Sequence, residues 1–490
     1  MGIIQRQSIK GTLVFMLGSL MQFGTSILII PNSLSEADQA IFRVYMSLIL
    51  MFSAFGFLGT NALMAKHLHE FEHKPQERRA LSSLTFLITL VGAIATVLVI
   101  FFSKEMIYSW KGNSNAYLLK YFWCVPISVF FFIFQIYFEQ YSIATHRLTA
   151  PSITREILLR GGILLAILAY HFKWLDVGAF FVAVTTCYVI SALVNAVYCI
   201  AIRNFRITLN LTQIKALPLR YYGKYSLFVF LITAFAAVVL NVDQPLVYGM
   251  LGAQSVDIYG NAVTLAAMVT IPYKPLSNIL LPFMYEAWHK QDYQKLNQIN
   301  QESSVNLTLV GTVMCVLLLA NTHNLMPFLP PLYHNTLFAP LAILAIGRVL
   351  DFTTGASTEL VLSAPSYKML ALFMFLSMVF SFVAYFALVP SYKAIGAAIV
   401  VSVNLLFYNA LKYYHLYKTY GLQPLHKNSF VAILIGVVIF ASQLLVPKMY
   451  WLADVIVRST LITLAFAIAV YKLQLVPFFN LTIQKYLGKS

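Results

Sequence analysis

Long apolar stretches separated by short polar segments repeat along the whole chain. Each stretch is close to the twenty or so residues that a helix needs to cross about 30 Å of hydrocarbon. This pattern predicts an all-α polytopic membrane protein with about fourteen transmembrane helices. The predicted spans are residues 11–31, 41–65, 82–103, 117–142, 154–171, 177–201, 226–251, 257–284, 305–328, 336–363, 369–390, 394–415, 428–447 and 452–471.

Composition supports the membrane assignment. Hydrophobic residues make up 60% of the 490 residues, charged residues only 10%, and the mean hydropathy is +0.77. Soluble domains carry about 25% charged residues. The net charge of +16 would suggest a nucleic-acid partner in a soluble domain. Here we attribute it to the loops of a membrane protein and expect no nucleic-acid partner.

The distribution of Lys and Arg predicts the orientation of the chain. Of the 33 Lys and Arg residues, 23 fall on the side of the predicted termini and seven on the other side. Cytoplasmic loops retain an excess of these residues, so both termini are expected in the cytoplasm. The basic segment Met1–Lys10 leads into an apolar run without a cleavage site, so we interpret it as the start of a first helix.

The longest connection, at about 202–225, follows the sixth span. Its end, KALPLRYYGKYSLF, resembles the opening RQSIKGTLVF, which indicates a weak internal repeat. Transporters are often built from two such halves around a central substrate site. We therefore predict an N-terminal six-helix lobe at 1–205 and a C-terminal six-helix lobe at 206–418. Two additional helices and a cytoplasmic tail follow at 419–490.

Motifs of soluble enzymes are absent from the sequence. It contains no GxxxxGK[ST], HExxH, GxSxG or dinucleotide-binding pattern. We therefore expect neither an enzyme, nor a cofactor, nor ATP coupling within this chain. His67, His69 and His73 form a cluster in a basic inner loop without thiols, and we favour a solvated loop over a metal site there.

Ionisable residues inside the spans are the candidate functional residues, because each is costly in hydrocarbon and usually faces a cavity or a partner. Lys274 lies between Pro272 and Pro275, which are expected to break the eighth helix. A cation beside unpaired carbonyls is typical of a transporter site. The alternative is a kinked helix whose lysine reaches the interface or a carboxylate.

The tenth span carries a polar stripe, since Arg348, Asp351, Gly355 and Glu359 recur at helical spacing and would share one face. Arg348 and Asp351 could contact substrate or form an internal ion pair. In the last span, Asp454 lies four residues before Arg458, and we favour a structural ion pair there.

Further charged residues occur in the fourth, fifth and seventh spans. Glu139 and Asp243 could line a cavity, and a buried carboxylate could carry a coupling proton. Arg155 and Arg160 open the fifth span at its cytoplasmic side, where a guanidinium could receive a pyrophosphate. Ordinary anchoring by positive charge explains these two arginines equally well.

Three stretches resemble a known family. They are MGIIQRQSIKGT, FSAFGFLGTNALMAK and NVDQPLVYGMLGAQSVDIYGNAVTLA. They are similar to bacterial polysaccharide flippases of the multidrug, oligosaccharidyl-lipid and polysaccharide exporter superfamily. In the last stretch Asp243, Tyr259 and Gly260 take the family positions. The helix count and the six plus six plus two layout extend the resemblance over nearly the whole chain.

The resemblance implies two lobes around a cavity that opens alternately to either side of the bacterial inner membrane. It also implies a substrate, an undecaprenyl pyrophosphate-linked saccharide for surface polysaccharides such as lipopolysaccharide. Membrane lipids, and a proton or sodium ion for coupling, are the other expected partners. The acidic residues near Lys274 and Arg348 depart from a purely cationic cavity, so a cation-coupled multidrug antiporter of the same superfamily stays open. A membrane-embedded saccharide polymerase or acyltransferase is a further alternative, which the short outer loops disfavour.

Overall fold

The computed structural model describes residues 14, 17–71, 74–109, 120–145, 147, 149–203, 205–208, 210–271 and 273–475. These residues form helices and connecting turns, with no strand among them, which confirms the predicted all-α class. The chain divides into two compact units, residues 1–257 and 258–490. The predicted division at residues 205 and 418 stays a prediction, and the predicted cytoplasmic termini lie outside the described residues.

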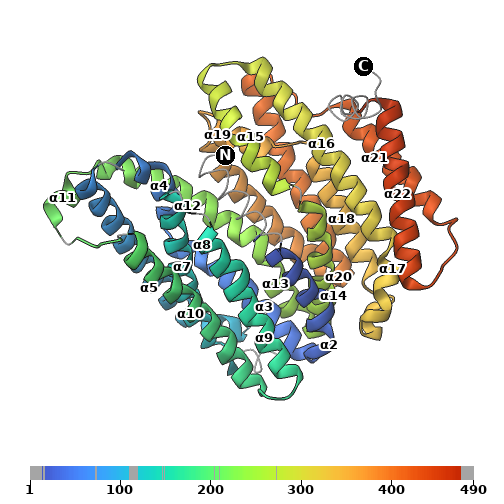
Figure 1. The fold of residues 1–490 in the computed structure, drawn as a ribbon, viewed down its shortest axis with the longest axis horizontal. Coiled ribbons are helices and arrows are strands. Elements are labelled where there is room, and N and C mark those ends of the chain that lie inside the picture. The colour runs from blue at the N-terminus through green and yellow to red at the C-terminus, as the bar shows by residue number, and fades with distance from the viewer. Residues whose placement is uncertain are drawn as a thin grey trace. The chain divides into compact units, whose positions relative to one another are not determined.

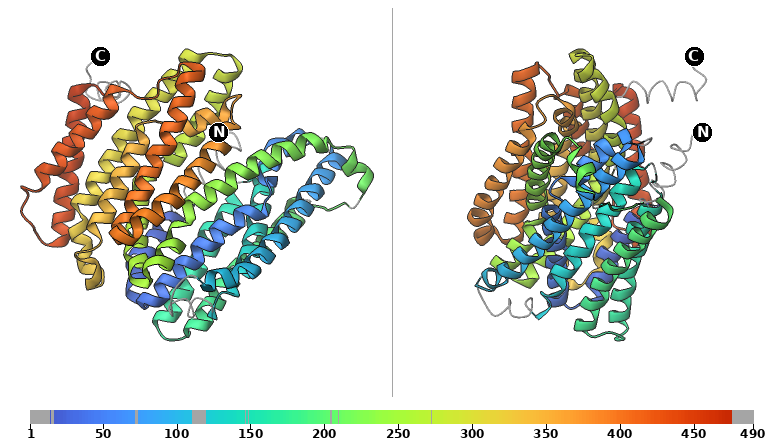
Figure 2. Two further views of the ribbon diagram at one scale, coloured as in Figure 1. Left: turned by 180° about the vertical axis from the view of Figure 1, so that it is seen from behind. Right: turned by 90° about the vertical axis from the view of Figure 1, so that its left-hand side faces the viewer.

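Unit 1 is a bundle of long helices with short helices at their ends (Figure 1). Its long helices α3, α5, α7, α10 and α12 run side by side, and Figure 2 gives two further views of them. Its helices are η1 (Thr25–Ile29), α2 (Ile30–Ser33), α3 (Glu36–Gly56), α4 (Thr60–His67), η2 (Leu68–Phe71), α5 (Pro75–Ser109), α7 (Cys124–Ala144), α8 (Thr149–Ile153), η3 (Thr154–Leu159), α9 (Arg160–His171), α10 (Val177–Arg203), α11 (Leu211–Lys215), α12 (Leu219–Asn241) and α13 (Asp243–Leu251).

Unit 2 begins within α14 (Ala253–Ala266) and contains the longest helical run. That run, α20, is two helices joined at Lys393, whose backbone is non-helical with φ 53°. The remaining helices are η4 (Ala267–Thr270), α15 (Tyr273–His289), α16 (Tyr293–Ala320), α17 (Thr322–Leu325), η5 (Met326–Phe328), η6 (Pro331–Tyr333), α18 (Phe338–Phe352), α19 (Ser357–Ser363), α20 (Met369–Tyr420), α21 (Lys427–Gln443) and α22 (Trp451–Leu473).

Eight helices among the described residues are long and apolar enough to cross a membrane, and a ninth is counted if the bent pair α18 and α19 forms one span. Their exposed side chains are largely apolar, as on α5, where Val91, Leu98 and Phe102 are exposed. Such surfaces fit a lipid environment rather than water. The chain is therefore a multi-pass membrane protein, while the count of fourteen spans stays a prediction.

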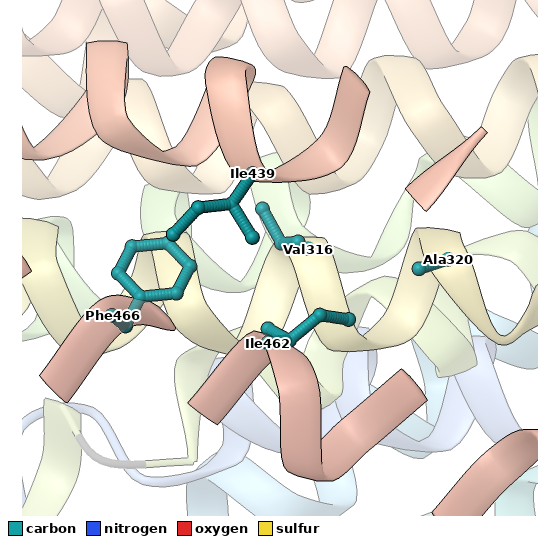
Figure 3. Packing of buried hydrophobic residues seen from close by; sticks show 5 residues of the cluster. All are labelled: Val316, Ala320, Ile439, Ile462 and Phe466. Carbon is teal, nitrogen blue, oxygen red and sulfur yellow. The ribbon is translucent and has the colours of Figure 1, made fainter. Parts of the chain in front are cut away.

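The last two helices pack on α16 through an apolar cluster in unit 2 (Figure 3). Val316 and Ala320 come from α16, Ile439 from α21, and Ile462 and Phe466 from α22. Gly436 of α21 brings its backbone close to α16, since a Cβ atom there would meet the Thr312 methyl group. Small residues at such contacts let membrane helices approach closely. This packing fixes the two additional helices to unit 2.

Candidate functional site

Four charged side chains meet in unit 1 where α7 passes η3 and the start of α9. Arg155 Nη1 lies 2.9 Å from Glu139 Oε1, and Arg155 Nε lies 3.0 Å from Glu156 Oε1. Arg160 Nη1 pairs with Glu156 Oε2. Glu139, Arg155 and Arg160 are candidates predicted from the sequence, and the structure joins them into one cluster with Glu156.

Burial differs between the two signs of charge in this cluster. The side chains of Glu139 and Glu156 are 6% and 0% exposed, whereas those of Arg155 and Arg160 are 32% and 26% exposed. The carboxylates thus orient the guanidinium groups from the buried side. The two arginine side chains are thus only partly buried, while the carboxylates beneath them are buried.

The local backbone explains how the three charges of the fifth span come together. Residues Thr154–Leu159 form a π-helix, which then continues as α9. A π-helical turn takes one residue more than an α-helical turn, so it shifts the side chains that follow to another face. Such turns are frequent at functional sites, and this one contains Arg155 and Glu156.

Gln135 adds an unsatisfied polar group to the same stretch of α7. It lies one turn before Glu139, and its side chain is fully buried. Among the described residues, neither Nε2 nor Oε1 of Gln135 has a hydrogen-bond partner. Buried amides nearly always have partners, so this one marks a place for a water molecule or a ligand group.

A second polar cluster surrounds a break in the tenth span of unit 2. Helix α18 ends at Phe352 and α19 begins at Ser357, with a bend of 47° between them. Gly355 lies in the break with φ +61°. The prediction that Arg348, Asp351, Gly355 and Glu359 share one helical face is therefore wrong, because the helix does not continue through Gly355. Broken helices at membrane depth are found where they are buried in protein or line a cavity.

Glu359 follows the break and is held by two hydroxyl groups of α15. Tyr273 donates a hydrogen bond of 2.7 Å to Glu359 Oε2, and Ser277 donates one of 2.5 Å to Oε1. The Tyr273 ring stacks on Phe352, with ring centroids 5.8 Å apart. These contacts fix a buried carboxylate in a membrane helix.

Lys412 of α20 lies in the same region, and it was not among the candidate residues selected from the sequence. Its side chain is buried, only 3% exposed. Nζ donates a 2.8 Å hydrogen bond to Thr358 Oγ1 and lies 4.4 Å from the ring centroid of Tyr408. Asp351 and Glu359 interact with it electrostatically. Lys412 lies inside the predicted span 394–415, one turn after Tyr408. This position was the signal in the sequence that could have identified it as a buried cation.

The predicted alternative of an Arg348–Asp351 ion pair is not formed. Asp351 Oδ1 accepts a 2.8 Å hydrogen bond from Asn409 Nδ2 of α20. Arg348 is partly exposed, and no hydrogen bond or ion pair joins it to the described residues. Arg348 is therefore a cation of a membrane helix without an ion-pair partner among the described residues, and its contact with substrate stays a prediction.

For two further candidates, Lys274 and Asp243, the structure gives the position in the fold but no ligand contact. Lys274 lies in the first turn of α15, after the interruption at η4 that the neighbouring prolines predict, but its side chain lies outside the described residues. Asp243 is buried at the first position of α13. The structure leaves the ligand contacts of both residues as predictions.

Other buried charges stabilise the fold. Asp454 and Arg458 form the predicted ion pair at 2.6 Å. Arg43 is buried in α3, where Nε lies 3.2 Å from Asp257 Oδ1. Arg43, Asp257 and Glu156 are buried charged groups that the sequence analysis did not select. Helical position alone does not reveal which neighbouring helix supplies a partner.

The predicted solvated histidine loop needs a correction. His67 is buried, and its ring lies 5.1 Å from that of Tyr222 and 5.7 Å from that of Tyr221. The side chain of His69 and all of His73 lie outside the described residues. Within the described part of the chain, no group of His, Cys, Asp and Glu residues could hold a metal ion.

Comparisons with known proteins bear on what these clusters do. The model of a family described as polysaccharide biosynthesis protein matches residues 6–288. No curated protein sequence matches the chain significantly.

One solved structure with the same fold is the lipid II flippase MurJ in an inward closed conformation. The TM-score is 0.75 at 12% sequence identity, and the match covers 95% of this chain and 99% of MurJ. A second is an inward-facing multidrug resistance MATE family transporter of the MOP superfamily, with a TM-score of 0.64, 12% identity, and coverage of 90% and 100%. A third is a MOP superfamily transporter from Pyrococcus furiosus, with a TM-score of 0.60, 13% identity, and coverage of 90% and 96%. The chain thus has the fold of MOP-superfamily transporters and flippases, and these neighbours are not enzymes, in agreement with the sequence analysis.

Proposed function

Because the chain belongs to the polysaccharide biosynthesis protein family, we propose that it flips a lipid-linked saccharide across a membrane. The proposed cargo is an undecaprenyl pyrophosphate-linked saccharide for surface polysaccharides such as lipopolysaccharide. It moves from the cytoplasmic to the periplasmic leaflet of the bacterial inner membrane. Both termini are cytoplasmic in this proposal, as the distribution of Lys and Arg suggests.

The observation that carries the proposal is the partly exposed pair Arg155 and Arg160, held by carboxylates within a membrane bundle. Glu139 and Glu156 engage Nη1 and Nε of Arg155, and the side chain as a whole is 32% exposed. A guanidinium group fits phosphate oxygens geometrically and stays charged at all relevant pH values. The buried carboxylates offset part of the cost of keeping two cations in the membrane, so the arginines can bind and release a pyrophosphate.

The transport cycle follows from the two-lobe architecture of such transporters. Alternating access would expose the head group to one side and then the other, while the polyprenyl tail stays in lipid. We assign the pyrophosphate to Arg155 and Arg160 of unit 1. Lys274 and Arg348 are the proposed cationic substrate-binding residues of unit 2. Asp243, Asp351 and Glu359 are the proposed carriers of a coupling proton or sodium ion.

The test is reconstitution in liposomes with a fluorescent undecaprenyl pyrophosphate saccharide. An impermeant quencher then reports how fast the head group moves between leaflets. We expect Arg155→Gln and Arg160→Gln each to slow this movement by about tenfold, since a hydrogen bond to a charged group contributes about 1.5–3 kcal/mol. Lys295→Gln, on an exposed turn of α16, is the matched control and should move cargo at the wild-type rate.

A multidrug antiporter is the competing function, and the buried Glu359 carboxylate with its two hydroxyl donors is the observation that favours it. An antiporter of this kind would bind organic cations on carboxylates in exchange for protons or sodium. Proton-driven efflux of an organic cation, together with no movement of the lipid-linked saccharide under any ion gradient, would decide for it.

A further inference from the structure

Helices α4, α5, α11 and α12 come together at one end of unit 1 (Figure 1). The sequence of this region has a concentration of positive charge. Residues 205–225 contain four cations and neither Asp nor Glu. The start of α5 contributes two more cations beside them. We call these six residues the basic face: Arg78, Arg79, Arg206, Lys215, Arg220 and Lys224.

The charge of the basic face is not neutralised by neighbouring acids. No ion pair joins any of its six cations to the residues that the structure describes. The described carboxylates nearby have other partners, because Glu70 contacts His67 at 3.0 Å and Glu77 contacts Lys74 at 3.6 Å. All members except the half-buried Arg78 are exposed. The face is thus available to an anionic ligand.

The backbone under the basic face is fixed by specific contacts. Thr208 N donates a 2.7 Å hydrogen bond to Ser83 Oγ of α5. Phe205 is buried among aromatic side chains, with its ring 5.0 Å from that of Tyr141. Arg78 Nη2 donates a 3.2 Å hydrogen bond to the hydroxyl group of Tyr141. These contacts hold the described residues Phe205 and Thr208 of the long connection against α7 and α5.

Residues around the basic face have the character of a membrane interface. Ile207, Leu219 and Tyr221 are exposed next to its cations. Lys66 extends along this edge, with Nζ 4.5 Å from the ring centroid of Tyr225 and 3.1 Å from Tyr221 Oη. Tyrosines with basic residues are enriched where a helix leaves the hydrocarbon region. This composition fits a face at the level of lipid phosphates.

We propose that the basic face binds the phosphate head groups of anionic phospholipids. Several cations at the end of a membrane helix attract anionic lipids, each contributing about 1 kcal/mol near the surface. Bound phospholipids would anchor the connection between α10 and α12. This inference is independent of the transported cargo, because it concerns lipids that surround the protein.

The experiment counts bound lipids on the full-length protein by native mass spectrometry. Phosphatidylglycerol, phosphatidylcholine and undecaprenyl pyrophosphate are titrated separately into detergent micelles that contain the protein. The variant removes three exposed cations, by Arg79→Gln, Arg220→Gln and Lys224→Gln. The control removes the same charge from exposed positions of unit 2, by Lys295→Gln, Lys418→Gln and Lys427→Gln. A charge-preserving variant, with Arg79→Lys, Arg220→Lys and Lys224→Arg, separates charge from folding.

We expect the basic-face variant to bind phosphatidylglycerol about fivefold more weakly for each cation removed. The control and the charge-preserving variant should bind it as the wild type does, and phosphatidylcholine should bind equally to all proteins. Equal losses in the basic-face and control variants would overturn the proposal, as would unchanged binding in the basic-face variant. Preferential binding of undecaprenyl pyrophosphate over phosphatidylglycerol at the basic face would also overturn it and make the face a docking site for cargo.

Discussion

Gly18 of the first helical segment lies directly against Glu156 of the π-helix η3. A Cβ atom on Gly18 would be 2.6 Å from both Cβ and Oε2 of Glu156. Glu156 is the carboxylate that joins Arg155 and Arg160. The absence of a side chain at residue 18 therefore allows the charged cluster to form beside the first helix.

The first prediction concerns this close approach. Gly18→Ala should destabilise the protein by about 1–3 kcal/mol, because an added methyl group in a packed site forces its neighbours to move. It should also slow cargo movement, since Glu156 positions both arginines. Thermal unfolding in detergent and the liposome assay measure the two effects. Gly24→Ala is the matched control, because no atom lies within 4 Å of its Cβ position. Equal stability of the two variants would contradict the role given to Gly18.

The second prediction concerns the break between α18 and α19. Gly355 has φ +61°, and a Cβ atom there would lie 2.6 Å from both Asn300 O and Ser303 Oγ. Gly421 has φ +67° but an open Cβ position. Gly421→Ala should therefore lower the free energy of unfolding by only about 1–2 kcal/mol, the strain of a left-handed backbone at a residue with a Cβ atom. Gly355→Ala should lower the free energy of unfolding by about 1–3 kcal/mol more, because the added methyl group would meet the backbone of α16. The free energies of unfolding of the two variants give the comparison.

The third prediction concerns the buried ion pair at the end of unit 2. Asp454 accepts hydrogen bonds from Arg458 at 2.6 Å and from Asn324 at 2.6 Å. Asp454→Ala leaves the Arg458 cation buried without its carboxylate, so the free energy of unfolding should fall by about 3–5 kcal/mol. Lys290→Gln breaks the exposed pair with Glu286 and should leave the unfolding temperature unchanged. A small effect of Asp454→Ala would mean that water reaches Arg458.

The fourth prediction concerns the hydroxyl donors of Glu359. Tyr273→Phe keeps the ring that stacks on Phe352 but removes the 2.7 Å hydrogen bond to Glu359. The loss should cost about 1.5–3 kcal/mol of stability, the contribution of a hydrogen bond to a charged group. If Glu359 carries the coupling ion, the dependence of cargo movement on the ion gradient should change as well. Tyr293→Phe removes an exposed hydroxyl group of α16 and is the control. An unaltered gradient dependence would argue against Glu359 as the carrier.

Sequence periodicity was sufficient for the class of fold, because twenty-residue apolar runs have few stable alternatives in a bilayer. It also located some irregular positions. The short gap predicted between residues 390 and 394 coincides with the kink at Lys393. The interruption before Lys274 is present between α14 and α15. Local chemistry determines such features, so a single sequence contains enough information to place them.

The clusters needed the tertiary structure, because their members come from different helices whose contacts helical spacing does not predict. The sequence alone selected Glu139, Arg155 and Arg160 as costly charges, yet it did not indicate that Glu156 joins the two arginines. It could not show that Asp351 pairs with Asn409 rather than Arg348, or that Lys412 is buried beside the helix break. Helical spacing defines which residues share a face only while the helix continues, and the turn at Gly355 ends it. The amino-acid sequence therefore determined the membrane class and the list of buried charges, and three-dimensional packing decided their partners.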